Sequence, residues 1–355
     1  AYFGGSVTQG YGASNENNIW RKQTQKWLSE KYPEAQINEI YACIGESGTY
    51  LGTYLLDEFV LAKEPDLVFL EYAINDRYAH IDKTNSKLQC ETIVREIKQQ
   101  YPKCDIVMLI TIDESTSGEN WFFDQAQAHS EIAEAYNIPI IYMGHALSDY
   151  INNNPDTCKW SDYFIDIVHP TDAGYLFYTD VIEEYLSNEL LAKVMPDEYL
   201  SDDVLPELQS DHLMDGNRRL IYATDEVLAG NDRNVWKYYP TTNINGKLSN
   251  KGSIGADVSE KPVFKYTFNG TELAIFNNIV AYSTDAAGYT FKYTVDGGEE
   301  KWGHFSTHNP TTVVSGLAPG EHTITIQIES WFSDWGIARW YIDVILTRDA
   351  SLQTV

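Results

Sequence analysis

Residues 66–72, DLVFLEY, form a short apolar run between two segments with helical periodicity, residues 50–62 and 90–100. A run this short, rich in aliphatic and aromatic side chains, is typical of a strand buried on both faces of its sheet. Strands of this kind that alternate with helices form a parallel sheet with helices on both faces. The segment therefore predicts an α/β fold.

The same alternation extends over residues 1–195, which we predict to be one domain. Further strands are expected at residues 37–44, 105–112 and 138–142, and further helices at residues 12–32, 122–136 and 171–191. Because ligands of such sheets bind beyond the carboxyl ends of the strands, polar residues that directly follow strands are the candidates for a site.

The pattern changes after residue 195. Residues 196–215 are acidic and poorly patterned, which predicts a linker. Residues 216–355 alternate apolar and polar side chains, as in HTITIQI at residues 322–328, and carry Asn-Gly, Asp-Gly and Pro-Gly turn signals. This second domain is predicted to be an antiparallel β-sandwich.

Charge and composition limit the partners. The formal net charge is −27, and such a field repels nucleic acid and anionic membranes, so neither is expected as a partner. No apolar run reaches the roughly 18 residues of a membrane span. The absence of a signal-peptide pattern favours a cytoplasmic location, with secretion as the alternative.

The four cysteines, Cys43, Cys90, Cys104 and Cys158, match no metal-ligand spacing. Four cysteines in a chain of 355 residues also do not indicate a disulfide scaffold. We therefore expect neither a metal nor a cofactor.

Two separated segments contain the parts of a serine hydrolase. Ser6 directly follows the expected first strand, and His169 lies far downstream with Asp166 three residues before it. A serine hydroxyl needs a base to remove its proton, and a carboxylate can hold the histidine in the correct tautomer. The alternatives are an ordinary Gly-Gly-Ser loop and a surface histidine at the start of a helix.

These segments resemble blocks of the SGNH (GDSL-like) hydrolase family. The resemblance covers residues 1 to about 192 and adds two blocks, residues 44–48 (IGESG) and 73–76 (AIND). It implies an SGNH-type parallel sheet flanked by helices, with Ser6, His169 and Asp166 as the catalytic triad. The chain departs from the family pattern at Gly5, where the motif usually has Asp, and at Ala73 and Glu46, where Gly is usual.

The resemblance also implies an oxyanion hole. Asn75 matches the family asparagine whose amide stabilises the developing oxyanion. A loop glycine contributes a backbone N–H, and for this we select Gly48 first and Gly45 second.

Tryptophans are the candidates for sugar binding. Trp160 precedes Asp166 and has a core position as its alternative, while Trp331 and Trp335 flank a polar turn of the second domain. A β-sandwich beside an SGNH domain resembles the carbohydrate-binding-like modules of carbohydrate esterases. The resemblance thus implies a serine acetylesterase for acetylated poly- or oligosaccharide of the mannan or xylan type. The alternatives are a lipase, thioesterase or arylesterase of the same fold, or an inactive carbohydrate-binding protein.

Overall fold

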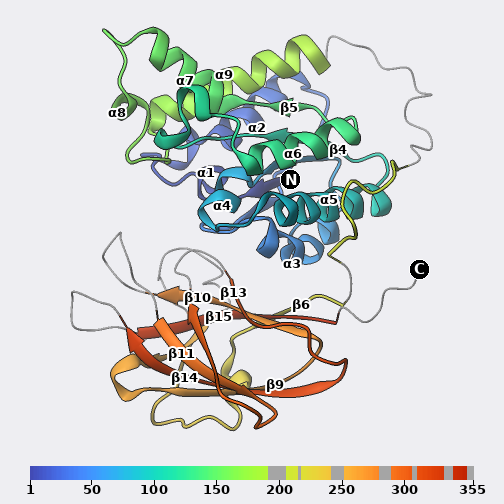
Figure 1. The fold of residues 1–355 in the computed structure, drawn as a ribbon. Helices are drawn as coiled ribbons and strands as arrows, with labels where there is room; N and C mark the ends of the chain where they lie inside the picture. The colour runs from blue at the N-terminus through green and yellow to red at the C-terminus, as the bar shows by residue number, and fades with distance from the viewer. Residues whose placement is uncertain are drawn as a thin grey trace. The chain divides into compact units, whose positions relative to one another are not determined.

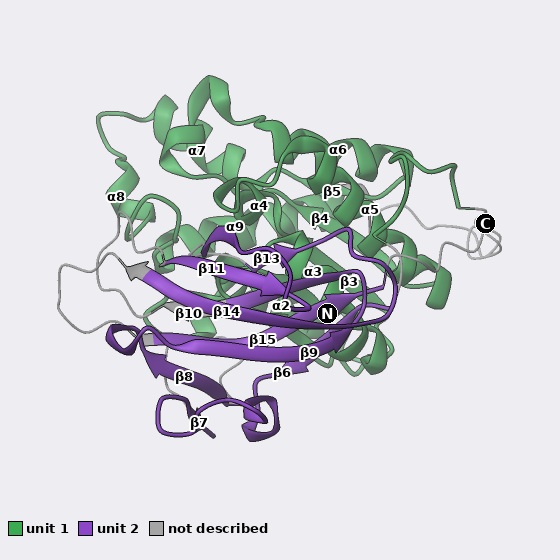
Figure 2. Cartoon of the chain, turned by 60° about the horizontal axis from the view of Figure 1, so that its bottom comes forward, with its two compact units in different colours: residues 1–214 green, residues 215–355 purple. Residues whose placement is uncertain are grey.

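The computed structural model describes residues 1–190, 205–214, 217–240, 252–279, 289–305, 310–331 and 339–349. The chain divides into two compact units, residues 1–214 and 215–355 (Figure 1, Figure 2). Part of the predicted linker, residues 205–214, is described and belongs to the first unit. The backbone N–H groups of Gln209 and Ser210 each donate to the carboxylate of Glu91 at 2.8 Å.

The described part of the first unit contains a parallel five-stranded sheet in the order β2-β1-β3-β4-β5. The strands are β1 (Tyr2–Gly4), β2 (Tyr41–Cys43), β3 (Leu67–Glu71), β4 (Asp105–Leu109) and β5 (Ile140–Ile141). This confirms the predicted parallel α/β sheet, although β2 and β5 are shorter than the apolar runs that predicted them.

Helices cover both faces of this sheet (Figure 1). One group contains α2, α7 and α9, and the other contains α3, α4, α5 and α6. Within each group the helices pack against one another. The helices are α1 (Ser6–Gln9), α2 (Trp20–Lys31), α3 (Thr49–Phe59), α4 (Ala73–Tyr78), α5 (Lys83–Gln100), α6 (Asp124–Ala135), α7 (Met143–Asn153), α8 (Trp160–Tyr163) and α9 (Asp172–Tyr185).

The central strand β3 shows why its sequence is apolar on both sides. Phe69 stacks on Tyr2 of β1 at 5.3 Å between ring centroids and meets the edge of Trp20 of α2 at 5.8 Å. Its neighbours Val68 and Leu70 point to the opposite face, because successive side chains of a strand alternate, and both are fully buried. Each face of the strand therefore contributes to a core.

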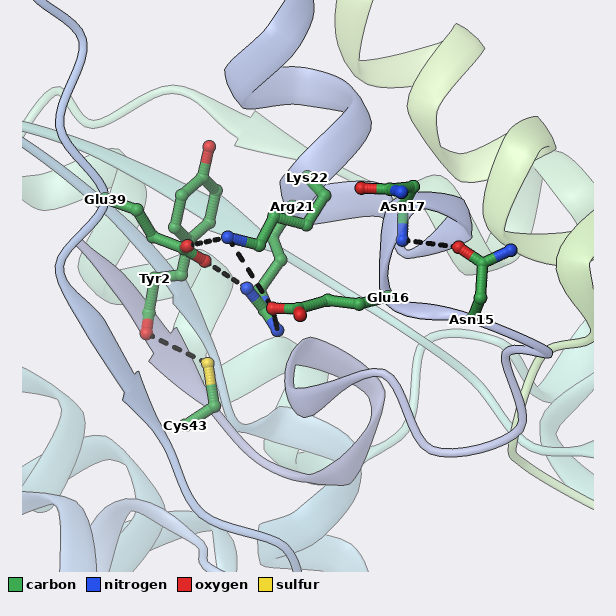
Figure 3. Close-up of polar contacts among 8 residues, drawn as sticks. All are labelled: Tyr2, Asn15, Glu16, Asn17, Arg21, Lys22, Glu39 and Cys43. Atoms are coloured by element: carbon green, nitrogen blue, oxygen red, sulfur yellow. Dashed lines mark hydrogen bonds and ion pairs between the residues drawn. The ribbon is translucent and has the colours of Figure 1, made fainter.

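A partly buried ion-pair cluster joins helix α2 to the segment that leads into β2. The guanidinium of Arg21 and the ammonium of Lys22 both contact the carboxylate of Glu39, and Arg21 also reaches Glu16 (Figure 3). Arg21 is almost fully buried. Because a buried charge is stable only when paired, this cluster fixes where α2 lies along the sheet edge.

The described strands of the second unit form two antiparallel sheets. One has the order β13-β10-β15-β8-β7, with β6 also paired to β15, and the other has the order β12-β11-β14-β9. The strands are β6 (Arg219–Tyr222), β7 (Lys237–Tyr239), β8 (Ser253–Asp257), β9 (Val263–Asn269), β10 (Glu272–Ile279), β11 (Tyr289–Val295), β12 (Lys301–Phe305), β13 (Thr311–Val314), β14 (Glu321–Trp331) and β15 (Arg339–Arg348).

One core joins the two sheets. Ile275 and Ile345 of the first sheet and Phe264, Phe291 and Ile326 of the second belong to the same buried cluster. This arrangement confirms the predicted β-sandwich, and it follows from strands whose inward side chains are apolar at every second position.

Candidate active site

Ser6 lies where the first strand ends. β1 stops at Gly4, Gly5 is the N-cap, and Ser6 is the first residue of the short helix α1. The two other blocks follow β2 and β3 in the same way, so residues 44–48 and Asn75 lie at the same carboxyl edge of the parallel sheet.

The structure brings Ser6, His169 and Asp166 into one hydrogen-bonded chain. Ser6 Oγ lies 2.8 Å from His169 Nε2, and His169 Nδ1 lies 2.7 Å from Asp166 Oδ2. With Nδ1 protonated toward the carboxylate, Nε2 is left to accept the serine proton. This is the geometry that general-base activation of a serine requires.

The Asp166 turn is held from several sides. Its Oδ1 accepts hydrogen bonds from the backbone N–H of Val168 at 2.9 Å and of His169 at 2.8 Å. Partial burial on its own would raise the pKa of Asp166, but these bonds and the His169 ring lower it below its usual value. Asp166 is thus kept ionised beside the imidazole.

Trp160, predicted as a sugar contact, is engaged within the protein. Its indole stacks on Phe164 with 3.9 Å between ring centroids, and its N–H donates to the carbonyl of Asp166 at 3.0 Å. One face and the polar edge of this ring therefore support the Asp166 turn. Trp331 ends β14 at the backbone level, and its side chain, like all of Trp335, lies outside the described residues.

Asn75 lies against the nucleophile turn. It is the third residue of α4 and almost fully buried. A Cβ atom added at Gly5 would lie between 2.2 and 2.7 Å from the atoms of its side-chain amide. Asn75 therefore occupies the space that a side chain at position 5 would need, and the departure from the usual motif at Gly5 has a steric reason.

The loop after β2 provides the second side of the site. A Cβ atom added at Gly45 would lie 3.9 Å from Ser6 Cβ, whereas one added at Gly48 would lie 2.5 Å from Asp76 Oδ1. The structure thus places Gly45, our second choice, beside Ser6, and Gly48, our first choice, beside Asp76 of α4. Between them, Glu46 has a φ of 61°, a left-handed conformation that glycine adopts at lower cost.

Asp76 ties this loop to the Asn75 helix. Its Oδ1 accepts the backbone N–H of Thr49 at 2.7 Å, and its Oδ2 accepts the hydroxyl of Ser86 at 2.7 Å. Nε2 of the buried His129 lies 3.2 Å from the same Oδ2. The sequence analysis assigns no role to Asp76 of the block at residues 73–76. Its partners lie far apart along the chain, so the sequence does not reveal these contacts.

Glu71 is a second buried carboxylate that the sequence analysis did not identify as a site residue. It ends β3, and burial raises its pKa to about 7, even though hydrogen bonds from Thr111, Thr8 and the Gly5 N–H lower it. The available signal was an acidic residue at the end of an otherwise apolar strand.

Tyr11 was also missed. Its side chain is 59% exposed, and its ring meets the imidazole of His169 with 4.6 Å between centroids. The hydroxyl of the buried Tyr175 donates to the carbonyl of Tyr11 at 2.8 Å and fixes the backbone there. An exposed aromatic ring in contact with the base is a surface on which a substrate can rest.

The arrangement places a serine hydroxyl, an imidazole and a carboxylate in one hydrogen-bonded chain, with the Asn75 amide and the loop of residues 44–48 beside the serine turn. Within the described ranges, no group of three or more His, Cys, Asp or Glu side chains is placed to hold a metal ion. In the same ranges, no helix combines the length and apolar character that crossing a bilayer requires.

Comparison with known proteins agrees with this geometry. Residues 2–176 match the model of the GDSL-like lipase/acylhydrolase family. No match to a curated protein is found.

Solved structures resemble the chain in fold. A two-domain esterase active on acetylated mannans, co-crystallised with mannopentaose, aligns with 98% of this chain and 89% of its own, with a TM-score of 0.71 and 18% identity. A second structure described as a two-domain esterase active on acetylated mannans aligns with 98% of this chain and 90% of its own, with a TM-score of 0.68 and 17% identity. An acetyl xylan esterase aligns with 52% of this chain and 98% of its own, with a TM-score of 0.44 and 22% identity.

The matched residues contain the Ser6 turn, residues 44–48 and 73–76, and the Asp166–His169 turn. The first unit of this chain is therefore a GDSL-like lipase/acylhydrolase domain, an ester hydrolase.

Proposed function

We propose that this protein is a serine esterase that removes O-acetyl groups from poly- or oligosaccharide of the mannan or xylan type. The observation that carries the proposal is the hydrogen-bonded chain from Ser6 Oγ through His169 to Asp166. These three hydrogen-bonded residues can cleave an ester of a small acyl group, such as an acetyl ester, without a cofactor.

The reaction proceeds through an acyl-enzyme. Ser6 Oγ attacks the acetyl carbonyl carbon while His169 Nε2 takes the serine proton, and Asp166 stabilises the imidazolium. The oxyanion accepts hydrogen bonds from the Asn75 amide and from the backbone N–H groups of Ser6 and Gly45. The intermediate collapses, the bond to the sugar oxygen breaks, and His169 gives that oxygen its proton.

Water then releases the acetate. His169 Nε2 accepts a proton from water as the water oxygen attacks the acyl-enzyme carbonyl, and it returns this proton to Ser6 Oγ when the acyl bond breaks. The products are acetate and a deacetylated sugar hydroxyl.

Three observations support a carbohydrate as the part of the substrate that bears the acetyl group. The two-domain fold is similar over almost the whole chain to that of an esterase named for acetylated mannans. The exposed ring of Tyr11 beside His169 offers a flat apolar surface of the kind on which a pyranose ring packs. A net charge of −27 favours a neutral substrate over an anionic one.

A second candidate is an esterase for longer, apolar acyl groups. Ile165 and Ile167, on either side of Asp166, are 52% and 53% exposed beside the triad. Apolar side chains at the rim of a site favour an apolar group of the substrate.

The test is acetate release from acetylated mannan and acetylated xylan by the wild type and by Ser6→Ala. Ser29→Ala is the matched control, since this hydroxyl on α2 only donates to the Gln25 carbonyl. We expect the Ser6→Ala variant to lose at least 10³-fold in rate and the control to match the wild type. Release that persists in Ser6→Ala would contradict the proposal, and Ser6-dependent cleavage of p-nitrophenyl octanoate in preference to acetate would favour the second candidate.

A further inference from the structure

The turn that presents Ser6 is built on a buried carboxylate. Glu71 is fully buried, and its Oε2 accepts the hydroxyl of Thr8 at 2.8 Å. Its Oε1 accepts the hydroxyl of Thr111 at 2.8 Å. Burying a carboxylate is costly, so a site that keeps one has a use for its hydrogen bonds.

The bond from Thr8 holds the segment that directly follows the nucleophile, because Thr8 lies two residues after Ser6 in the same short helix. The helix that begins at Ser6 has only four residues, which is too short to be stable by its own hydrogen bonds. The position of Ser6 therefore depends on what holds its neighbours.

A side chain at position 5 cannot hold Ser6 in place. The amide of Asn75 fills the space above Gly5, so a carboxylate of the usual motif has no room there. In this chain the carboxylate of Glu71, at the end of β3, bonds to the turn through Thr8, and the Thr111 hydroxyl connects it to the segment after β4.

From this geometry we infer that Glu71 is a positioning residue for Ser6, which holds the nucleophile turn at the distance that His169 requires. The inference rests on the proposed role of Ser6 as nucleophile. Glu71 is placed to act on Ser6 through Thr8 and not by touching the substrate or the reacting atoms.

The experiment compares Glu71→Gln with Glu91→Gln. Glu91 is the matched control because it is equally buried and accepts three hydrogen bonds, from the Tyr136 hydroxyl and from the N–H groups of Gln209 and Ser210, on helix α5. The measurements are the rate at which a fluorophosphonate labels Ser6, kcat and KM for p-nitrophenyl acetate, and the unfolding temperature.

We expect Glu71→Gln to lower both the labelling rate and kcat at least tenfold, with KM changed less than twofold. Glu91→Gln lowers the unfolding temperature and leaves labelling and kcat within twofold of the wild type. A merely structural role for Glu71 predicts the same behaviour for both variants, and that outcome overturns the inference.

Thr8 provides a second test that leaves the carboxylate in place. Thr8→Val removes the hydroxyl while keeping the shape of the side chain, and it is expected to lower kcat. Thr8→Ser keeps the hydroxyl and is expected to have the kcat of the wild type. Wild-type kcat in Thr8→Val overturns the inference even if Glu71→Gln does not fold.

The outcomes separate this inference from the proposed function. If Glu71→Gln slows the labelling of Ser6 but the wild type releases no acetate from either glycan, the carbohydrate substrate is wrong and the positioning role of Glu71 is supported. A wild type that does not label at Ser6 removes both.

Discussion

At the residue scale, the exposed ring of Tyr11 is the part of the site that is most open to substrate. It contacts His169 on one side and solvent on the other. A sugar ring that covers about 50 Å² of its apolar face gains about 1.3 kcal/mol at roughly 25 cal/mol per Å², which corresponds to about tenfold in affinity.

Tyr11→Ala is therefore expected to lower kcat/KM for an acetylated oligosaccharide about tenfold and to leave that for p-nitrophenyl acetate within about twofold. Tyr32→Ala is the control, since Tyr32 is also exposed and lies at the carboxyl end of α2, outside the residues described at the site. Equal losses on both substrates would show that Tyr11 supports His169 and does not hold the sugar.

Individual residues differ in how readily the sequence discloses them. The three-residue spacing of Asp166 and His169 and the place of Ser6 directly after a strand are local features, so the sequence pattern predicts each of them. Tyr11 and Glu71 depend on exposure and burial, which only the folded chain defines. Which loop glycine lies beside Ser6 likewise depends on the path of the loop after β2.

At the scale of elements, Asp76 joins four helices on one face of the sheet. Its carboxylate lies on α4 and contacts Thr49 of α3, Ser86 of α5 and His129 of α6. All of these side chains are buried, so the carboxylate has no water to replace a lost partner.

Asp76→Asn is expected to destabilise the first unit by about 3 kcal/mol, because it leaves buried donors and His129 without their charged partner. It is also expected to lower kcat for p-nitrophenyl acetate, since Thr49 ends the loop that contains Gly45. Chemical denaturation and steady-state kinetics provide the measurements. Asp82→Asn is the control, because Asp82 caps α5 in an exposed position where Asn serves equally well.

Element boundaries were harder to predict than element types. The helix expected at residues 90–100 begins at Lys83, because the Asp82 side chain caps the earlier turn through the Asn85 N–H. The helices α4 and α7 were not predicted, since each directly follows a strand and the two apolar patterns merge. The second-unit strand β9 (Val263–Asn269) matched its alternating pattern closely, because one face of that strand is exposed.

At the scale of the whole molecule, each unit has its own core. The cluster around Phe69 contains residues of the first unit, and the cluster around Phe264 contains residues of the second. A chain with two separate cores is expected to unfold in more than one step.

We therefore expect two calorimetric transitions that respond to different substitutions. Phe264→Ala, which empties a fully buried site, should destabilise the second unit by about 3–5 kcal/mol and leave the temperature at which p-nitrophenyl acetate cleavage is lost unchanged. Phe69→Ala should lower that temperature. Activity lost at the same reduced temperature in both variants would mean that the units unfold as one.

The hydrogen bond between Ser6 and His169 joins residues 163 positions apart, and two further contacts close nearly the same loop. The carboxylate of Asp172 accepts the backbone N–H of Ser14 at 2.8 Å, and Tyr175 reaches the carbonyl of Tyr11. Closing so long a loop is entropically costly, and contacts of this range form late when a chain folds. During synthesis the serine emerges first but stays an ordinary alcohol until α9 has left the ribosome and docked. Ester cleavage thus reports completion of the first unit, and on refolding it should recover no earlier than the slowest phase of that unit.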